Sequence, residues 1–315
     1  MNVKPLNRPT TQLTTLALRR ATWLALAYLA LIFLLPANHD TMRAFHLSSL
    51  GYRLALLTAS LPLIAAWLVA FAGHAKLSEY TNMIRKTPEG PYFEKLAAGT
   101  GWLAWSLPVP ALAALLLNAL GNECRVFYSV SIIMVNYLNL LFALVAFSII
   151  GAASRGLITH AKLKFSITAS RVIVLIFLVA GVAYCYLTFR HLDLSSVAST
   201  HNPYYLPVWL MVLSVIIPYL YAWFVGLLAA YEIVLFGQRA EGVLYGQSLR
   251  LLASGLTVII GSSVILQYIH GIQPRSNHLI FGAQTVWGVL LHMVAGIGFV
   301  LLLLGASRLK RIEEV

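Results

Sequence analysis

Two stretches of the sequence share one motif, ASLPLIAAW at residues 59–67 and SVIIPYLYAW at residues 214–223. Each places Pro-x-x-x-Ala-Trp inside a long apolar run, and the two prolines lie 156 residues apart. A proline inside a helix removes a backbone donor, and within a membrane the neighbouring helices satisfy the carbonyl that this frees. The pair therefore predicts a membrane-embedded bundle that uses one helical unit twice.

The composition of the chain indicates an integral membrane protein. Of the 315 residues, 60% are hydrophobic and 10% are charged, whereas soluble domains average about 25% charged residues. A helix needs roughly 20 apolar residues to cross the hydrocarbon layer. Eight runs satisfy this, so we predict an all-α polytopic fold with eight transmembrane helices. The runs cover residues 19–36, 52–74, 102–120, 126–152, 170–190, 205–232, 250–270 and 280–306.

The first apolar run is expected to remain in the protein as helix one. A cleaved signal peptide has a short leader and a small-residue cleavage site. Here the leader is about 20 residues long, and the LLPANHD that follows the run offers no good site of that kind.

The distribution of basic residues predicts the orientation. Eight spans put both termini on one side, and that side, with the loops after helices two, four and six, holds most of the 22 Lys and Arg. Cytoplasmic loops carry such an excess, so we expect both termini in the cytoplasm and the protein in the plasma membrane. The formal charge of +12 then reflects topology and attraction to anionic headgroups, and no nucleic-acid partner is expected. The outer side holds only Arg43, Arg53, Arg125, Arg190 and Arg275.

The offset between the two proline motifs persists along the chain and predicts an internal duplication. Further identities occur at the shift of 156 residues, and others near helices four and eight at a shift of 153. We expect two four-helix halves in parallel orientation about a pseudo-twofold axis along the membrane normal. The expected segments are a cytoplasmic N-terminal segment (1–18), a first repeat (19–155), a second repeat (156–308) and a cytoplasmic tail (309–315). The matched pairs include Pro62 and Pro218, Trp67 and Trp223, Gly90 and Gly246, Gly99 and Gly255, Ser154 and Ser307, and Arg155 and Arg308.

Polar residues in the last helix of each half suggest a site. His292 is the deepest ionisable side chain of the predicted spans, and at the shift of 153 it falls on Asn139. Asn136 and Asn139 share a helix face at three-residue spacing, and Gln284 and His292 lie on one stripe at multiples of four. Because buried ionisable groups are unfavourable unless paired, these four are the candidate ligand-binding residues. The alternative is hydrogen bonding between helices without any ligand.

Pro62 and Pro218 are expected to bend helices two and six at equivalent depths. Two interpretations stay open. The bends are either a duplicated packing feature or hinges beside the site.

Six of the nine histidines are expected on the outer side. Clustered imidazoles bind transition metals, so His39, His46, His201 and His278 are weak candidates for a metal or haem site. Solvated or interfacial histidines are the other interpretation, and the cofactor stays unknown. The six are His39, His46, His191, His201, His270 and His278.

Eight helices in two halves, with termini inside and histidines toward the outer face, resemble the haem A synthases in outline. Those enzymes place paired histidines on the even-numbered helices and carry cysteine pairs in outer loops. This chain has Asn139 where a symmetric ligand would stand, and its only cysteines, Cys124 and Cys185, are far apart in sequence. The resemblance is therefore one of architecture. Both cysteines are expected near the outer side, which leaves a disulfide open.

Several functional classes lack their motifs in this chain. It has no phosphate-binding glycine loop with its lysine, and no His-Glu-x-x-His, Gly-x-Ser-x-Gly or Cys-x-x-Cys motif. Three functions stay open, and the first is preferred. They are a transporter-like or ligand-holding bundle with its site on the pseudo-twofold axis, a scaffold that assembles with membrane proteins or with itself, and a haem- or metal-binding redox enzyme. Enzymatic activity is uncertain, with a non-enzymatic role favoured.

Overall fold

The computed structural model describes residues 10–35, 48–121, 125–163, 208–239, 243–272 and 277–313, with isolated positions between them. Helices and short connections make up all of this described part. In chain order the helices are α1 (Thr10–Leu34), α3 (Ser49–Met83), α4 (Gly90–Trp105), α5 (Pro108–Gly121), α6 (Arg125–His160), α9 (Val208–Arg239), α10 (Val243–Ile272) and α11 (Asn277–Glu313).

Seven segments of the described chain are long and apolar enough to cross a membrane. The prediction of an all-α multipass membrane protein is therefore confirmed. The predicted helix at 170–190 lies outside the described residues except for four isolated positions, so the count of eight stays a prediction. The seven are Leu13–Leu34, Ser49–Met83, Gly90–Leu116, Tyr137–His160, Ile217–Arg239, Leu244–Ile265 and Val289–Glu313.

The third apolar run differs from its prediction, because it is a broken helix. α4 ends at Trp105 and α5 begins at Pro108. Pro108 has no amide hydrogen to continue the helix, and a proline disfavours helical backbone in the residue before it. The break leaves Ser106 and Leu107 between two helical segments inside a single candidate span.

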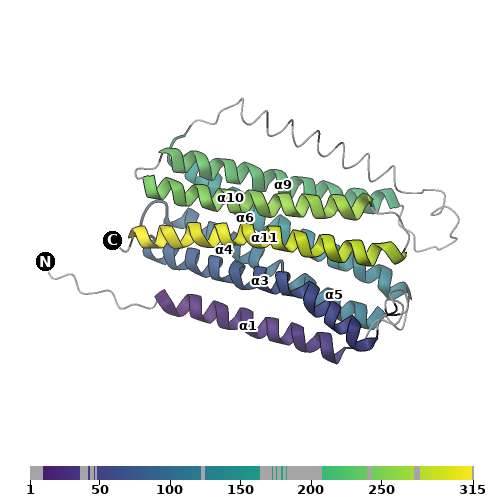
Figure 1. Cartoon of the computed structure of the whole chain (residues 1–315). Coiled ribbons are helices and arrows are strands. Elements are labelled where there is room, and N and C mark those ends of the chain that lie inside the picture. Colours follow the sequence, from purple (N-terminus) through teal and green to yellow (C-terminus); the bar gives the residue numbers. More distant parts are fainter. Residues whose placement is uncertain are drawn as a thin grey trace.

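Six helices form a closed ring in which each contacts the next, in the order α3, α4, α6, α9, α10, α11 and back to α3. α1 packs against α3 and α5 at the edge of the bundle (Figure 1). Figure 1 also shows that α1 begins and α11 ends at the same end of the bundle. The larger buried apolar cluster joins the helices of the ring, and a second cluster packs α1 against α3 and α5 at the edge of the bundle.

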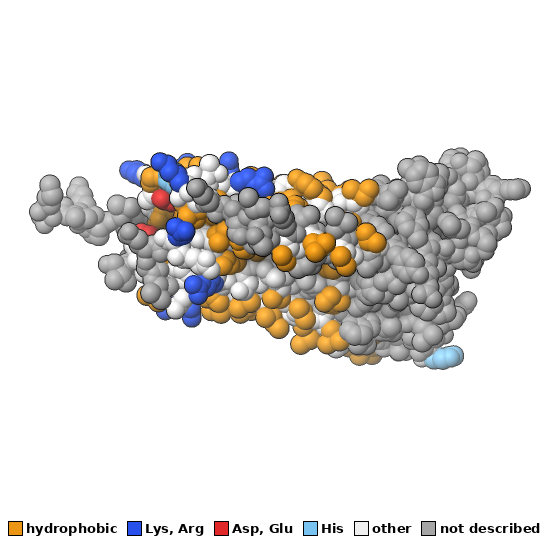
Figure 2. All heavy atoms as spheres, turned by 90° about the horizontal axis from the view of Figure 1, so that it is seen from above, with side chains coloured by type: hydrophobic (Ala, Val, Ile, Leu, Met, Phe, Trp, Pro, Cys, Tyr) orange, Lys and Arg blue, Asp and Glu red, His pale blue; other side chains and the backbone are white. Residues whose placement is uncertain are grey.

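The bundle has apolar sides and one basic end. Figure 2 shows orange side chains along its middle, while Lys and Arg gather toward the end where α1 begins and α11 ends. We call this the basic end. Large apolar side chains exposed on the sides, among them Trp23, Leu26 and Leu61, are what contact with lipid requires. The described Lys and Arg at the basic end include Arg85, Lys86, Arg155, Arg239 and Arg308.

Glycines allow the closest approaches between neighbouring helices of the ring. A Cβ on Gly99 of α4 would lie 2.5 Å from Ile150 Cγ1 of α6. A Cβ on Gly255 of α10 would lie 2.6 Å from the carbonyl oxygen of Gly298 on α11. Both distances are below van der Waals contact, so only glycine fits at either crossing. The two glycines, paired at the shift of 156, thus allow the same close packing in the two parts of the ring.

Candidate functional site

A cavity of about 450 Å³ lies among the helices, and all eight of the described helices contribute to its lining. Most of the lining is leucine, alanine and phenylalanine. This size and an apolar lining with few polar groups are typical of small-molecule sites, which span roughly 300–1,000 Å³. The polar lining residues are Tyr28, Ser106, Asn139, Tyr219, Ser262, Ser263 and His292.

The cavity brings together two of the four residues singled out in the sequence. Asn139 of α6 and His292 of α11 both line it, and both are half-buried. Asn139 makes no hydrogen bond to any residue that the structure describes, so its amide remains available to a ligand. Asn136 and Gln284 lie on α6 and α11, but their side chains are outside the described set.

Two serines of the wall, Ser106 and Ser262, use their hydroxyl groups in the same way. Ser106 Oγ donates to the carbonyl oxygen of Leu103 at 2.7 Å, and Ser262 Oγ donates to that of Ile259 at 2.8 Å. Each hydroxyl proton is thus used by a carbonyl three residues earlier in the chain, whereas the oxygen lone pairs remain acceptors. Sequence reasoning missed both serines, although Ser106 falls on Ser262 at the same shift of 156.

Each tryptophan of the repeated motif packs against a tyrosine of the cavity wall. The rings of Tyr28 and Trp67 meet edge to face with centroids 5.4 Å apart, and those of Tyr219 and Trp223 lie at the same centroid distance. Trp67 and Trp223 are 0% and 2% exposed. Each buried tryptophan thus packs behind a tyrosine of the cavity wall, although Tyr28 comes from α1 and Tyr219 from the same helix as Trp223.

The hydrogen bonding of the two tryptophans differs. Trp223 Nε1 donates to Ser263 Oγ at 3.3 Å, whereas Trp67 Nε1 is buried with no partner among the described residues. At the predicted repeat shift of 156, Ser263 falls on Leu107, whose side chain offers no hydrogen-bond acceptor.

The repeated prolines stand directly before residues of the cavity wall. α3 continues through Pro62 and α9 through Pro218. Leu63 and Tyr219, the next residues, both line the cavity. A change in helix direction at either proline would therefore move the wall.

Of the four histidines predicted as metal ligands on the outer side, only His46 has a side chain that the structure describes. His46 is exposed and has a left-handed backbone with φ of 50°. The side chains of His39, His201 and His278 lie outside the described residues, as do Cys124 and Cys185. In the part of the chain that the structure describes, no three His, Cys, Asp or Glu side chains gather as a metal site requires.

Buried charge lies near the basic end, away from the cavity wall. Glu79 of α3 is 0% exposed. It accepts hydrogen bonds from Lys310 Nζ of α11 at 2.8 Å and from Lys76 Nζ at 3.2 Å. Thr14 of α1 donates to it through both its backbone amide and its hydroxyl. Sequence reasoning missed Glu79 as a buried group.

A second buried carboxylate, that of Glu232, links α9 to α6. Ser154 Oγ of α6 donates to Glu232 Oε2 of α9, and Arg155 Nε lies 3.7 Å from Glu232 Oε1. Arg155 is 67% exposed, so its charge is largely solvated, while Glu232 is buried. Glu79 and Glu232 therefore occupy similar positions, each on the second helix of one predicted half and bonded to the last helix of the other.

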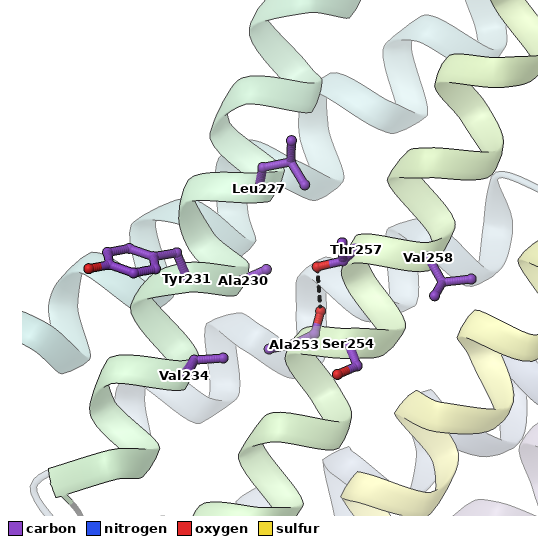
Figure 3. Close-up of a pocket in the computed structure, with 8 residues that line it drawn as sticks. All are labelled: Leu227, Ala230, Tyr231, Val234, Ala253, Ser254, Thr257 and Val258. Carbon is purple, nitrogen blue, oxygen red and sulfur yellow. Dashed lines mark hydrogen bonds between the residues drawn. The ribbon is translucent and has the colours of Figure 1, made fainter. Parts of the chain in front are cut away.

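A second hollow, of about 370 Å³, lies between α9 and α10 (Figure 3). Figure 3 shows Ala230, Ala253 and Thr257 between the two helices, with the Thr257 hydroxyl bonded to the carbonyl oxygen of Ala253 at 3.0 Å. Its lining is mostly small and aliphatic, with hydroxyl groups from Tyr231, Ser254 and Thr257, and it contains no amide, imidazole or charged side chain. The cavity with Asn139 and His292 is therefore the candidate site.

Comparisons with protein-family models, curated proteins and solved structures find no match to this chain. The function proposed for the protein therefore rests on the geometry of the site.

Proposed function

We propose that this multipass membrane protein holds a small molecule in the cavity between two related halves, as a transporter-like bundle. The observation that carries the proposal is that Asn139 and His292, far apart in sequence, line one mainly apolar cavity of about 450 Å³. Sites for small molecules combine such a lining with a few polar groups that orient the ligand.

The order of contacts around the ring supports the two halves, 19–155 and 156–308. If α3, α4 and α6 correspond to α9, α10 and α11, every contact in the ring has a counterpart. The contact of α3 with α4 matches that of α9 with α10, and α4 with α6 matches α10 with α11. The contact of α6 with α9 matches that of α11 with α3. A pseudo-twofold axis through the centre of the ring explains this pattern.

The cavity wall supports the same axis. Five pairs of residues correspond at shifts of 156 or 153, and both members of each pair line the cavity. These pairs support a cavity on the proposed axis, where ligand sites of repeated transporter folds are found. The pairs are Leu63 and Tyr219, Leu103 and Ile259, Ser106 and Ser262, Leu107 and Ser263, and Asn139 and His292.

The proposed orientation places the basic end in the cytoplasm. The described Lys and Arg gather there (Figure 2), which agrees with the excess of positive charge in cytoplasmic loops. Both termini then face anionic headgroups on the inner side of the plasma membrane. Pro62 and Pro218 would act as hinges, since each precedes a residue of the cavity wall.

The experiment that tests the ligand-holding function is extraction of the purified protein, followed by mass spectrometry of the small molecules released. Ala295 lines the cavity, so Ala295→Phe should fill it and reduce the bound molecule at least tenfold. Val294 is exposed on the same helix, so Val294→Phe is the matched control and should retain it.

The alternatives give different results in the same preparation. A stoichiometric haem or metal, detected by its absorbance or by elemental analysis, would favour the redox enzyme. A wild-type protein that releases no molecule, and that co-purifies with a membrane protein or with itself as an oligomer, would favour the scaffold.

A further inference from the structure

We infer that the cavity takes an uncharged, mainly apolar molecule that carries a hydroxyl or carbonyl group. The inference rests on the proposed ligand-holding function and goes beyond it by naming the class of ligand. Three features of the described residues carry it: the absence of charge from the wall, the available amide of Asn139, and the apolar surface around that amide.

No Asp, Glu, Lys or Arg among the described residues lines the cavity. A charged molecule placed among apolar groups is strongly unfavourable unless an opposite charge pairs with it. The buried Lys310 and the partly exposed Lys76 both pair with Glu79 near the basic end, so neither lysine is a partner for a ligand in the cavity. His292 is the one described wall residue that can take up a proton. Apart from it, the described wall offers an ion no charged partner, so an uncharged ligand fits it.

The polar groups of the wall favour a hydroxyl or a carbonyl. The Asn139 amide offers two N–H donors and one acceptor oxygen, and it has no partner among the described residues. A carbonyl oxygen can accept from it, and a hydroxyl can both donate and accept. The hydroxyl protons of Ser106 and Ser262 already bond to backbone carbonyls, so the oxygens of these serines can accept from the same hydroxyl.

The remaining wall would hold an apolar body. Phe147 and Phe299 line the cavity with Tyr28 and Tyr219, and leucines and alanines fill the spaces between them. Burial of apolar ligand surface contributes roughly 25 cal/mol per Å², so the apolar body would supply most of the affinity. The polar group would then set the orientation at Asn139.

The test uses four probes that share one apolar body and differ in the terminal group. They are 4-phenylbutanol, butylbenzene, 4-phenylbutyrate and 4-phenylbutylammonium, and the last two are ionised at pH 7.5. We expect the alcohol at saturating concentration to raise the melting temperature of the purified protein in nanodiscs by about 3 °C or more. Butylbenzene should give a smaller shift, and the two ions should give none.

A variant locates the polar contact. Asn139→Leu keeps the size of the side chain but loses its amide, so the dissociation constant of the alcohol should rise about tenfold. The dissociation constant of butylbenzene should stay the same. Tyr137→Phe on the same helix is the control, because Tyr137 is exposed outside the cavity lining.

Each outcome bears on one of the two proposals. Binding of the carboxylate or the ammonium as tight as that of the alcohol would overturn the inference and leave the ligand-holding function standing. Binding of none of the four probes would also overturn the inference. If, in addition, Ala295→Phe changed nothing in the extraction experiment, the proposed function would fail as well. The probe comparison uses wild-type protein, so it decides the matter even where Asn139→Leu does not fold.

Discussion

The buried carboxylate of Glu79 should be the most sensitive charged group of the bundle. It is 0% exposed and binds Lys310 at 2.8 Å, Lys76 at 3.2 Å and Thr14. Its contacts join α1, α3 and α11. Glu79→Leu removes the acceptor that these groups share and leaves two ammonium groups without it. Breaking a buried pair in this way is destabilising by about 3–5 kcal/mol.

The partners of Glu79 should matter in order of their burial. Lys310→Met leaves Lys76 and Thr14 to bind the carboxylate, so its effect should be about 1.5–3 kcal/mol, as for one charged hydrogen bond. Lys76 is 25% exposed, so Lys76→Met should destabilise by about 1 kcal/mol or less. The double variant Glu79→Leu/Lys310→Met should be more stable than Glu79→Leu alone, because an apolar pair replaces the ion pair.

Reversible unfolding in mixed micelles, analysed as a double-mutant cycle, measures these differences. The expected order of destabilisation is Glu79→Leu, then Lys310→Met, then Lys76→Met. A stability of Glu79→Leu within about 0.5 kcal/mol of wild type, the usual range for surface substitutions, would refute the reasoning that this carboxylate is buried and paired.

Three further predictions concern packing and the second carboxylate. Gly99→Leu and Gly255→Leu should each lower the free energy of unfolding by about 1–3 kcal/mol or more through overpacking. A Cβ added at Gly261 would meet nothing within 4 Å. In the same unfolding assay Gly261→Ala should therefore be neutral or stabilising by up to about 1 kcal/mol. Trp223→Phe should be more destabilising than Trp67→Phe in thermal melts, because only Trp223 loses a hydrogen bond; an equal effect would contradict this. Arg155→Met should change stability by less than about 1 kcal/mol because Arg155 is 67% exposed, and a loss above 2 kcal/mol would show that Glu232 depends on it.

The sequence predicted the features that depend on the length of apolar runs and on polar residues within those runs. Length and composition predicted the membrane helices, and His292 stood out because an ionisable group inside an apolar span is rare. The pairing of His292 with Asn139 came from the repeat shift, and the structure places both on one cavity. The cavity itself was not predictable, since its volume depends on how side chains from eight helices pack.

Other features required the three-dimensional structure. The third run was predicted as one helix because its hydropathy is continuous, yet Pro108 breaks it locally. Glu79 lies beyond the end of the predicted run 52–74, where a charged residue indicates a solvated helix end. In the structure α3 continues to Met83, and Lys310 of α11 donates a hydrogen bond to this carboxylate. The partner is more than two hundred residues away in sequence, and no local pattern identifies it.

An experimental density map of the wild-type protein in nanodiscs, with a bound antibody fragment as a marker for electron microscopy, tests the central claim most directly. The account predicts non-protein density inside the ring of helices, within hydrogen-bonding distance of the Asn139 amide and adjacent to His292. A map in which side chains close this space, so that Asn139 contacts other residues of the chain and no cavity remains, would contradict it.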